Sequence, residues 1–297
     1  MRLTPLVLLL CLVLAACGDG APSAADAPVV VTTTTQVTDL TWHVMCPARQ
    51  KPACAGPQGL LGSDQDPHGY ELRPDDVARL ADADLIVRSG GEVDEWLDEA
   101  IESSGTDAPV VTLLDAAGGG DPHWWTDPVA AQRAVEAIRD ALDGTGGAGS
   151  YSANATLYLQ RLERLDASIE RCVERVAPED RKVVTNHDAL ERFADRYGIE
   201  VIGTVIPSRS TQAQSSAGEV AELVRAIRRS GVTAVFSEAA VNRDVGRAIA
   251  EEAGVRVGEP LHVDSLGDLG YLAATARNAE ALVDGMSGGK VRCLPGS

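Results

Sequence analysis

From residue 29 onward, short runs of β-branched and other apolar residues alternate with longer stretches whose apolar positions recur at a helical period. Such alternation is typical of parallel α/β sheets, because each short buried strand is followed by a helix that covers the sheet. The runs that predict strands are 29–34, 60–61, 84–88, 109–113, 182–185, 200–206, 233–237 and 255–257. The stretches that predict helices are 74–80, 93–101, 128–142, 189–197, 213–229, 242–253, 269–283 and one that starts at residue 39.

The longest helical pattern covers residues 152–176, between a glycine-rich break and Pro178. Its apolar positions step by three and four residues and form one face, made of Tyr158, Leu162, Leu165, Ile169, Cys172 and Val176. A helix of about 25 residues would be a rod of roughly 38 Å. The fold class we predict is therefore α/β, with two parallel-sheet lobes (29–150 and 179–297) joined by one long rigid helix (151–178).

The N-terminal segment, residues 1–17, has the pattern of a signal peptide, and its apolar stretch is too short to span a bilayer permanently. The run from Leu14 to Gly18 resembles a bacterial lipobox, in which Cys17 would become the lipidated first residue. An ordinary secretory signal with an incidental cysteine is the alternative. Residues 18–28, rich in Gly, Ala, Pro and Asp, predict a flexible tether. We expect the mature chain outside the cytoplasm, lipid-anchored to a bacterial membrane, at the cell surface or in the periplasm.

Four cysteines follow the predicted lipidation site: Cys46, Cys54, Cys172 and Cys293. An even number in an oxidising compartment predicts disulfides, and four cysteines allow three pairings. The short spacing favours Cys46 with Cys54, and Cys172 with Cys293 would then tie the C-terminus to the long helix. A cysteine zinc site is the competing interpretation, but the spacing contains no tight Cys-x-x-Cys pattern.

The charge of the chain limits its partners. A formal net charge of −18 argues against nucleic acid, whose binding requires clustered Lys and Arg. The usual consequence of such acidity is solubility, so it says little about function.

Three of the five histidines stand in polar turns directly after strand-like runs. His68 and His123 each end an Asp-Pro-His motif, and His187 is the centre of Asn-His-Asp. Ligands of open α/β sheets bind outside the carboxyl ends of strands, and neutral imidazole is a common ligand of zinc. Asp264 follows the last strand at the same level and offers a carboxylate. The sequence therefore predicts a four-ligand metal site between the lobes.

Three more residues at this level are expected near the ligands rather than on the metal: Glu238, Trp124 and His262. Glu238 follows a strand and is expected to line the cleft. Trp124 and its neighbour Trp125 are expected to form one wall. His262 is the strongest rival of Asp264 for the fourth position, because strand alternation would put both on one face.

Several motifs together resemble the zinc/manganese solute-binding lipoproteins of bacterial ABC importers, the cluster A-I family. They are Asp-Pro-His-Gly-Tyr-Glu-Leu-Arg-Pro at 66–74, Asp-Pro-His-Trp-Trp-Thr-Asp-Pro at 121–128, Thr-Asn-His-Asp-Ala at 185–189, Phe-Ser-Glu at 236–238 and Val-Asp-Ser at 263–265. The resemblance covers nearly the whole mature chain. It implies two lobes joined by a rigid helix, with the metal bound between them by His68, His123, His187 and Asp264.

The resemblance also implies a function. We expect an extracytoplasmic receptor that captures Zn²⁺ and delivers it to a membrane permease, with affinity falling as the pH drops through the histidine range near 6.5. Mn²⁺ is the alternative cargo, but manganese-selective members usually carry glutamate where His187 stands. The chain lacks the histidine-rich loop of many zinc members before the second Asp-Pro-His. We expect a monomer, with a periplasmic metallochaperone as a further candidate partner.

Three functions of other kinds compete with this expectation. A zinc-dependent hydrolase would need an open water position, whereas four protein ligands close the site, and no His-Glu-x-x-His motif is present. A receptor for an organic metal chelate would need few direct metal ligands. A surface adhesin would not require three histidines in a cleft. We therefore expect a binding protein rather than an enzyme.

Overall fold

The structure is a computed structural model that describes residues 27–47, 54–146 and 151–293. The predicted signal peptide (1–17), its Cys17 and most of the predicted tether (18–28) lie outside these residues. Among the residues that are described, no helix has both the length and the apolar character needed to cross a bilayer.

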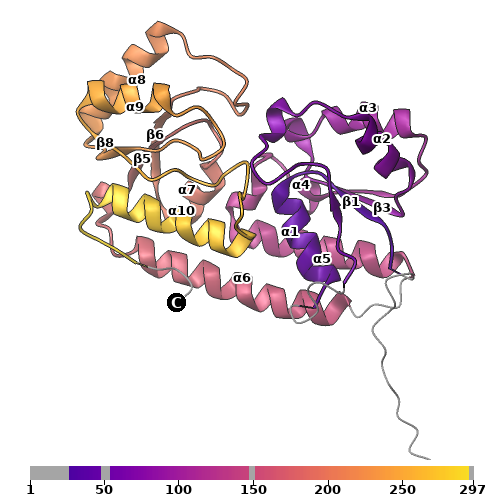
Figure 1. Ribbon diagram of the computed structural model, residues 1–297. Helices are drawn as coiled ribbons and strands as arrows, with labels where there is room; N and C mark the ends of the chain where they lie inside the picture. The colour runs from indigo at the N-terminus through magenta and orange to yellow at the C-terminus, as the bar shows by residue number, and fades with distance from the viewer. Residues whose placement is uncertain (1–26, 48–53, 147–150, 294–297) are drawn as a thin grey trace, which may run out of the picture.

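The N-terminal lobe, drawn in indigo to magenta in Figure 1, contains a four-stranded parallel sheet with the order β2-β1-β3-β4. Its strands are β1 (Val30–Thr32), β2 (Gln58–Gly59), β3 (Leu85–Arg88) and β4 (Val110–Thr112). Its helices are α1 (Thr35–Met45), α2 (Pro74–Ala81), α3 (Trp96–Ser104), α4 (Leu113–Ala116) and α5 (Pro128–Gly144), with short 3₁₀ turns η1 (Pro67–Gly69), η2 (Gly91–Val93) and η3 (Trp124–Thr126).

The C-terminal lobe repeats the arrangement with the parallel order β6-β5-β7-β8. Its strands are β5 (Lys182–Thr185), β6 (Glu200–Thr204), β7 (Ala234–Val235) and β8 (Arg256–Val257). Its helices are α7 (Glu191–Tyr197), α8 (Ala217–Ser230), α9 (Asp244–Ala253) and α10 (Tyr271–Met286), with a 3₁₀ turn η4 (Pro178–Asp180). In both sheets the first strand lies between the second and the third, so the two lobes have the same topology.

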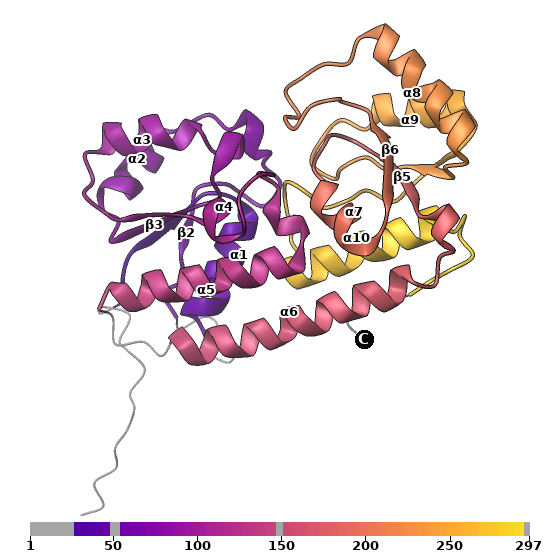
Figure 2. The ribbon, with the colours of Figure 1, turned by 180° about the vertical axis from the view of Figure 1, so that it is seen from behind.

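One helix, α6 (Tyr151–Val173), runs along both lobes, as Figures 1 and 2 show from opposite sides. Its buried face divides between two cores. Tyr158 and Leu162 pack in the core of the N-terminal lobe, whereas Leu165 and Ile169 pack in that of the C-terminal lobe. The predicted apolar face thus connects the two lobes, and it explains why one uninterrupted helix joins them.

Both disulfides join the residues that the spacing favoured. Cys46 bonds Cys54 just after α1, and Cys172 bonds Cys293, with Cα atoms 5.8 Å apart in each pair. The second bond fixes the segment after α10 to the end of α6. It therefore holds the C-terminal part of the described chain against the connecting helix.

The strand predicted at 60–61 is wrong in position, since β2 lies at Gln58–Gly59, and several helices begin at other residues than predicted. The structure starts α8 at Ala217 rather than at residue 213, because Ser216 and Glu219 form a capping box at that point. Helix α1 begins at Thr35, four residues before the predicted position, because the Thr34 hydroxyl accepts a hydrogen bond from the Val37 amide. A capping side chain sets a helix start more sharply than the apolar pattern does. As a consequence, residues 207–216 form a loop between β6 and α8.

Candidate metal centre

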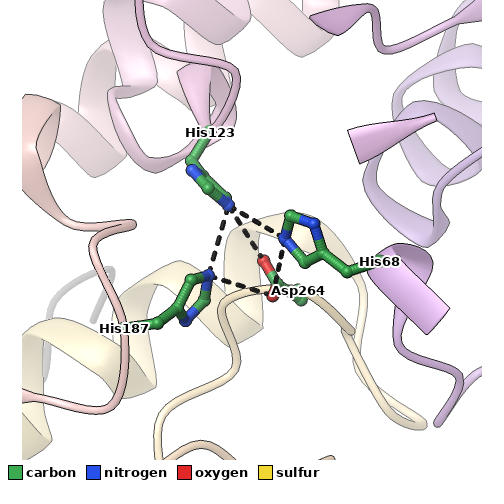
Figure 3. Close-up of side chains that lie close together, drawn as sticks. All are labelled: His68, His123, His187 and Asp264. Atoms are coloured by element: carbon green, nitrogen blue, oxygen red, sulfur yellow. Dashed lines mark hydrogen bonds and ion pairs between the residues drawn. The ribbon is translucent and has the colours of Figure 1, made fainter. Parts of the chain in front are cut away.

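Four side chains meet between the lobes, each from the segment that follows a different strand. His68 lies in η1 after β2, His123 directly precedes η3, His187 follows β5, and Asp264 follows β8. Figure 3 shows their polar ends turned toward one point. The four side chains are at most 1% exposed. The parallel topology of the two sheets therefore brings together the four residues that the sequence analysis selected.

The spacing of the ligand atoms fits a single tetrahedral ion. The four atoms all lie within 4.8 Å of one another. The Nε2 atom of His123 is 3.3 Å from Nε2 of His68 and 3.3 Å from Nε2 of His187. Asp264 Oδ2 lies 3.5 Å from His68 Nε2 and 3.3 Å from His187 Nε2. Ligands bound at about 2.0–2.1 Å in a tetrahedron lie about 3.3 Å apart, and these four separations of 3.3–3.5 Å are close to that value.

The two Asp-Pro-His motifs have the same backbone turn. In the first, Asp66 Oδ1 accepts a hydrogen bond from the His68 amide at 2.9 Å, and in the second Asp121 Oδ1 accepts one from the His123 amide at 3.0 Å. This Asx turn, with proline fixing φ in between, holds each histidine at the end of its strand–loop segment. Three glycines with positive φ, Gly118 to Gly120, lead into the second motif.

Carboxylates contact the Nδ1 atoms of two imidazoles, on the side of the ring away from the cluster. The Nδ1 atom of His187 lies 2.5 Å from Glu238 Oε1, and Nδ1 of His123 lies 3.2 Å from Asp121 Oδ1. An N–H at Nδ1 that donates to a carboxylate leaves the lone pair of Nε2 free to face a metal. The expected position of Glu238 beside the ligands agrees with this contact, and Asp121 is an additional residue of the same kind.

The other two residues expected near the ligands are placed differently. The ring in contact with His123 is that of Trp125, with centroids 5.3 Å apart, while the buried Trp124 stacks edge-on against Trp125 and donates to Ser89. Trp125 rather than Trp124 is therefore the wall of the site. His262 is absent from the cluster of ligand atoms, and its ring lies near Gly267.

Asp264 is held by the opposite lobe, and its buried carboxylate faces the imidazoles of His68, His123 and His187. The carbonyl of Val263 accepts hydrogen bonds from Gln36 Nε2 at 2.6 Å and from Trp125 Nε1 at 2.9 Å. Within the described residues neither oxygen of Asp264 accepts a hydrogen bond. A buried carboxylate without donors is costly unless a cation compensates it. A buried carboxylate that accepts no hydrogen bond and faces three imidazole nitrogens supports the presence of a cation site.

In the metal-free protein, protons on the clustered side chains offset the negative charges of the carboxylates. Burial lowers the pKa of His187, but the negative charges of Asp264 and Glu238 outweigh it and raise that pKa to about 9. Burial lowers the pKa of His68 to about 3, with the neighbouring His123 and His187 acting in the same direction. Burial raises the pKa of Asp264 to about 7. At neutral pH His187 therefore carries the proton that an incoming metal must replace.

This arrangement predicts that metal binding releases a proton even at a pH well above the usual pKa of histidine. At pH 8 His187 is protonated in the metal-free protein and must be neutral in the complex, so we expect about one proton released per Zn²⁺ and a roughly tenfold rise in affinity per pH unit up to about 9. Calorimetry at pH 8 in buffers of different ionisation enthalpy measures the proton count. A count of zero would contradict the assignment of the proton to His187.

A contact between the lobes that no sequence pattern predicted fixes the segment before His123. The guanidinium of Arg192 in α7 donates to the carbonyl of Ala117 at 3.2 Å and to that of Gly119. Arg133 in α5 donates to the same Ala117 carbonyl at 2.7 Å. Both arginines occupy polar positions of amphipathic helices, which a sequence pattern assigns to solvent. They hold the backbone that precedes the second Asp-Pro-His motif.

The chain is similar in sequence and in structure to known metal-binding proteins. The chain is 28% identical over 284 residues to the zinc-binding protein TroA of Treponema pallidum, covering 88% of this chain and 90% of that protein. It is 29% identical over 238 residues to the manganese-binding lipoprotein MntA of Halalkalibacterium halodurans, covering 75% of this chain and 78% of that one. The solved structure of TroA superposes with a TM-score of 0.79 at 26% identity, covering 88% of this chain and 99% of that chain.

The similarity extends through both lobes and the connecting helix. Residues 30–285 match the family described as zinc-uptake complex component A, periplasmic, a family of metal-binding solute-binding proteins. This range begins at β1 and ends within α10, so it includes the four clustered side chains. With two parallel-sheet lobes, a shared connecting helix and a match over most of its length, the chain belongs to this family.

Proposed function

We propose that this protein is the extracytoplasmic solute-binding component of an ABC importer, and that it captures Zn²⁺ and delivers it to the membrane permease. The metal ligands we propose are His68, His123, His187 and Asp264. The observation that carries the proposal is the set of four buried side chains whose nitrogen and oxygen atoms lie within 4.8 Å of one another, with a carboxylate among them that accepts no hydrogen bond. Three neutral imidazoles and one carboxylate suit zinc in donor type and number.

Capture and delivery fit the closed geometry better than catalysis does. A catalytic zinc usually has three protein ligands and keeps a position for water beside a general base. Here the four proposed ligands would fill the coordination sphere, and Glu238, whose carboxylate contacts His187, would accept a hydrogen bond from the imidazole N–H. We therefore propose a transport cargo rather than a catalytic ion, and no enzymatic activity.

The position of the protein in the cell follows from the N-terminal pattern and the family. We propose that the signal peptide is cleaved between Ala16 and Cys17 and that Cys17 is lipidated, with residues 18–28 as the tether to the membrane. The partners would be a cognate permease and, in a periplasm, a metallochaperone that supplies the ion. We propose that the protein acts as a monomer, since the four ligands all come from one chain.

Manganese is the second candidate cargo, because the relatives include a manganese-binding lipoprotein as well as a zinc-binding one. A competition experiment separates the two. With metal-stripped protein we expect one Zn²⁺ per chain, and an affinity for Zn²⁺ at least about 100-fold higher than for Mn²⁺, since the divalent order favours zinc at a nitrogen-rich site. Titration with Zn²⁺ in the presence of excess Mn²⁺ measures the ratio. Displacement of Zn²⁺ by equimolar Mn²⁺ would reverse the assignment of the cargo.

A further inference from the structure

The loop between β6 and α8, residues 207–216, reaches from the C-terminal lobe to the first Asp-Pro-His motif of the N-terminal lobe. Figures 1 and 2 both show the segment between β6 and α8 extending from the C-terminal lobe toward the N-terminal lobe. The hydroxyl of Thr211 donates to Asp66 Oδ2 at 2.5 Å, across 145 residues of sequence. Next to it, Gln212 lies against the backbone beside His68, since a Cβ on Gly69 would come within 2.7 Å of Gln212 Nε2.

The carboxylate of Asp66 therefore accepts two hydrogen bonds, one from each lobe. Its Oδ1 accepts from the His68 amide, and its Oδ2 accepts from Thr211 of the other lobe. The equivalent Asp121 makes the same turn with its Oδ1, but its buried Oδ2 has no hydrogen-bond partner among the described residues. The contact with Thr211 is thus not a requirement of the Asx turn. It is an additional link present in only one of the two motifs.

The other end of this loop is fixed to the segment that carries His187. The carbonyl of Asn186 accepts from the Ile206 amide at 2.7 Å, and the amide of Asp188 donates to the Ser208 carbonyl at 2.9 Å. The loop is also ordered internally, because the hydroxyls of Ser208 and Ser210 accept hydrogen bonds from the amides of residues 210 and 212. A short, ordered loop therefore connects the backbone around His187 with the carboxylate that positions His68.

We propose that Thr211 is a positioning residue for His68, and that its bond to Asp66 is a latch that must break before the lobes part and release the ion. The inference rests on the proposed metal-binding function. His68 and Asp264 come from opposite lobes, so separation of the lobes opens the coordination sphere. Thr211 is only half-buried, so water can replace its hydrogen bond. The latch therefore slows release without preventing it.

The test compares Thr211→Val, which keeps the shape and removes the hydroxyl, with Thr211→Ser, which keeps the hydroxyl. Loss of one hydrogen bond to a charged group predicts Zn²⁺ dissociation about tenfold faster in Thr211→Val. Thr211→Ser is expected to match the parent within about twofold, because it restores the donor. Stopped-flow mixing of the zinc-loaded proteins with a strong chelator measures these rates. Equal rates for the parent and Thr211→Val, or a serine variant as fast as the valine variant, would overturn the proposal.

A second measurement does not depend on zinc binding. Hydrogen exchange of the metal-free proteins is expected to be faster in Thr211→Val than in the parent at residues 62–70 and 207–216, and unchanged in α6. Unchanged exchange in both segments would contradict the latch even if the parent binds Zn²⁺ tightly. A parent that fails to bind Zn²⁺ would instead contradict the proposed function, while the exchange comparison still decides whether the latch exists.

Discussion

Replacement of His187 with alanine is expected to raise the dissociation constant for Zn²⁺ by roughly 100- to 1000-fold. A complete four-ligand zinc site contributes about 10–16 kcal/mol, so one ligand of four contributes on the order of 3 kcal/mol. His187 is central to the cluster, because its Nε2 faces both His123 and Asp264 at 3.3 Å. Competition with a calibrated zinc chelator measures the affinity of the stripped variant.

Two matched variants show whether this loss comes from the metal ligand. His262→Ala removes a histidine two residues from Asp264 but outside the cluster, so we expect its zinc affinity to stay within about threefold of the parent. His187→Asn places an amide N–H near the position of Nδ1, where it can donate to Glu238, and it is expected to lose affinity as His187→Ala does, because an amide is a poor zinc ligand. Unchanged affinity in His187→Ala, or an equal loss in His262→Ala, would remove His187 from the site.

The architecture was accessible from the sequence because it depends on local patterns. Runs such as 84–88 and 182–185 contain β-branched residues between turns, and the structure has strands there. The apolar face of α6 predicted one continuous helix because its period is maintained through residues that enter two different cores. The cluster of His68, His123 and His187 followed from the rule that parallel strands present their carboxyl ends at one edge.

Contacts between the lobes could not be predicted from local sequence patterns. Residues 213–216 fit a helical period, so the pattern extended α8 into the loop that carries Thr211, and only the capping box at Ser216 marks the true start. The bond between Thr211 and Asp66 joins residues 145 positions apart, and no local pattern encodes it. Likewise, adjacent tryptophans on a 3₁₀ turn point in different directions, so the sequence could not choose between Trp124 and Trp125 as the wall.

Replacement of Asp264 with asparagine is expected to separate metal binding from stability. The variant keeps the size of the side chain and loses the negative charge, so the dissociation constant for Zn²⁺ should rise by roughly 100-fold or more. Metal binding adds about 4 kcal/mol of stability when Zn²⁺ is present at about 1000 times its dissociation constant. At the same zinc concentration a 100-fold weaker variant gains only about 1.4 kcal/mol. Zinc should therefore raise the melting temperature of the parent by roughly 10 °C at pH 8 and that of Asp264→Asn by about 4 °C or less.

Without metal, Asp264→Asn should be at least as stable as the parent. Burial raises the pKa of Asp264 from 3.8 to about 7 in the folded protein, so the folded state loses stability as the pH rises from the unfolded value through about 7. At pH 8 the buried charge opposes folding, and part of that cost is offset by His187, whose raised pKa keeps it protonated beside the carboxylate. Metal-free Asp264→Asn should therefore melt at or above the temperature of the metal-free parent at pH 8, with no such advantage at pH 4. A metal-free variant that melts several degrees below the parent at pH 8 would mean that Asp264 is a structural residue, because a carboxylate kept for an ion makes the empty site less stable.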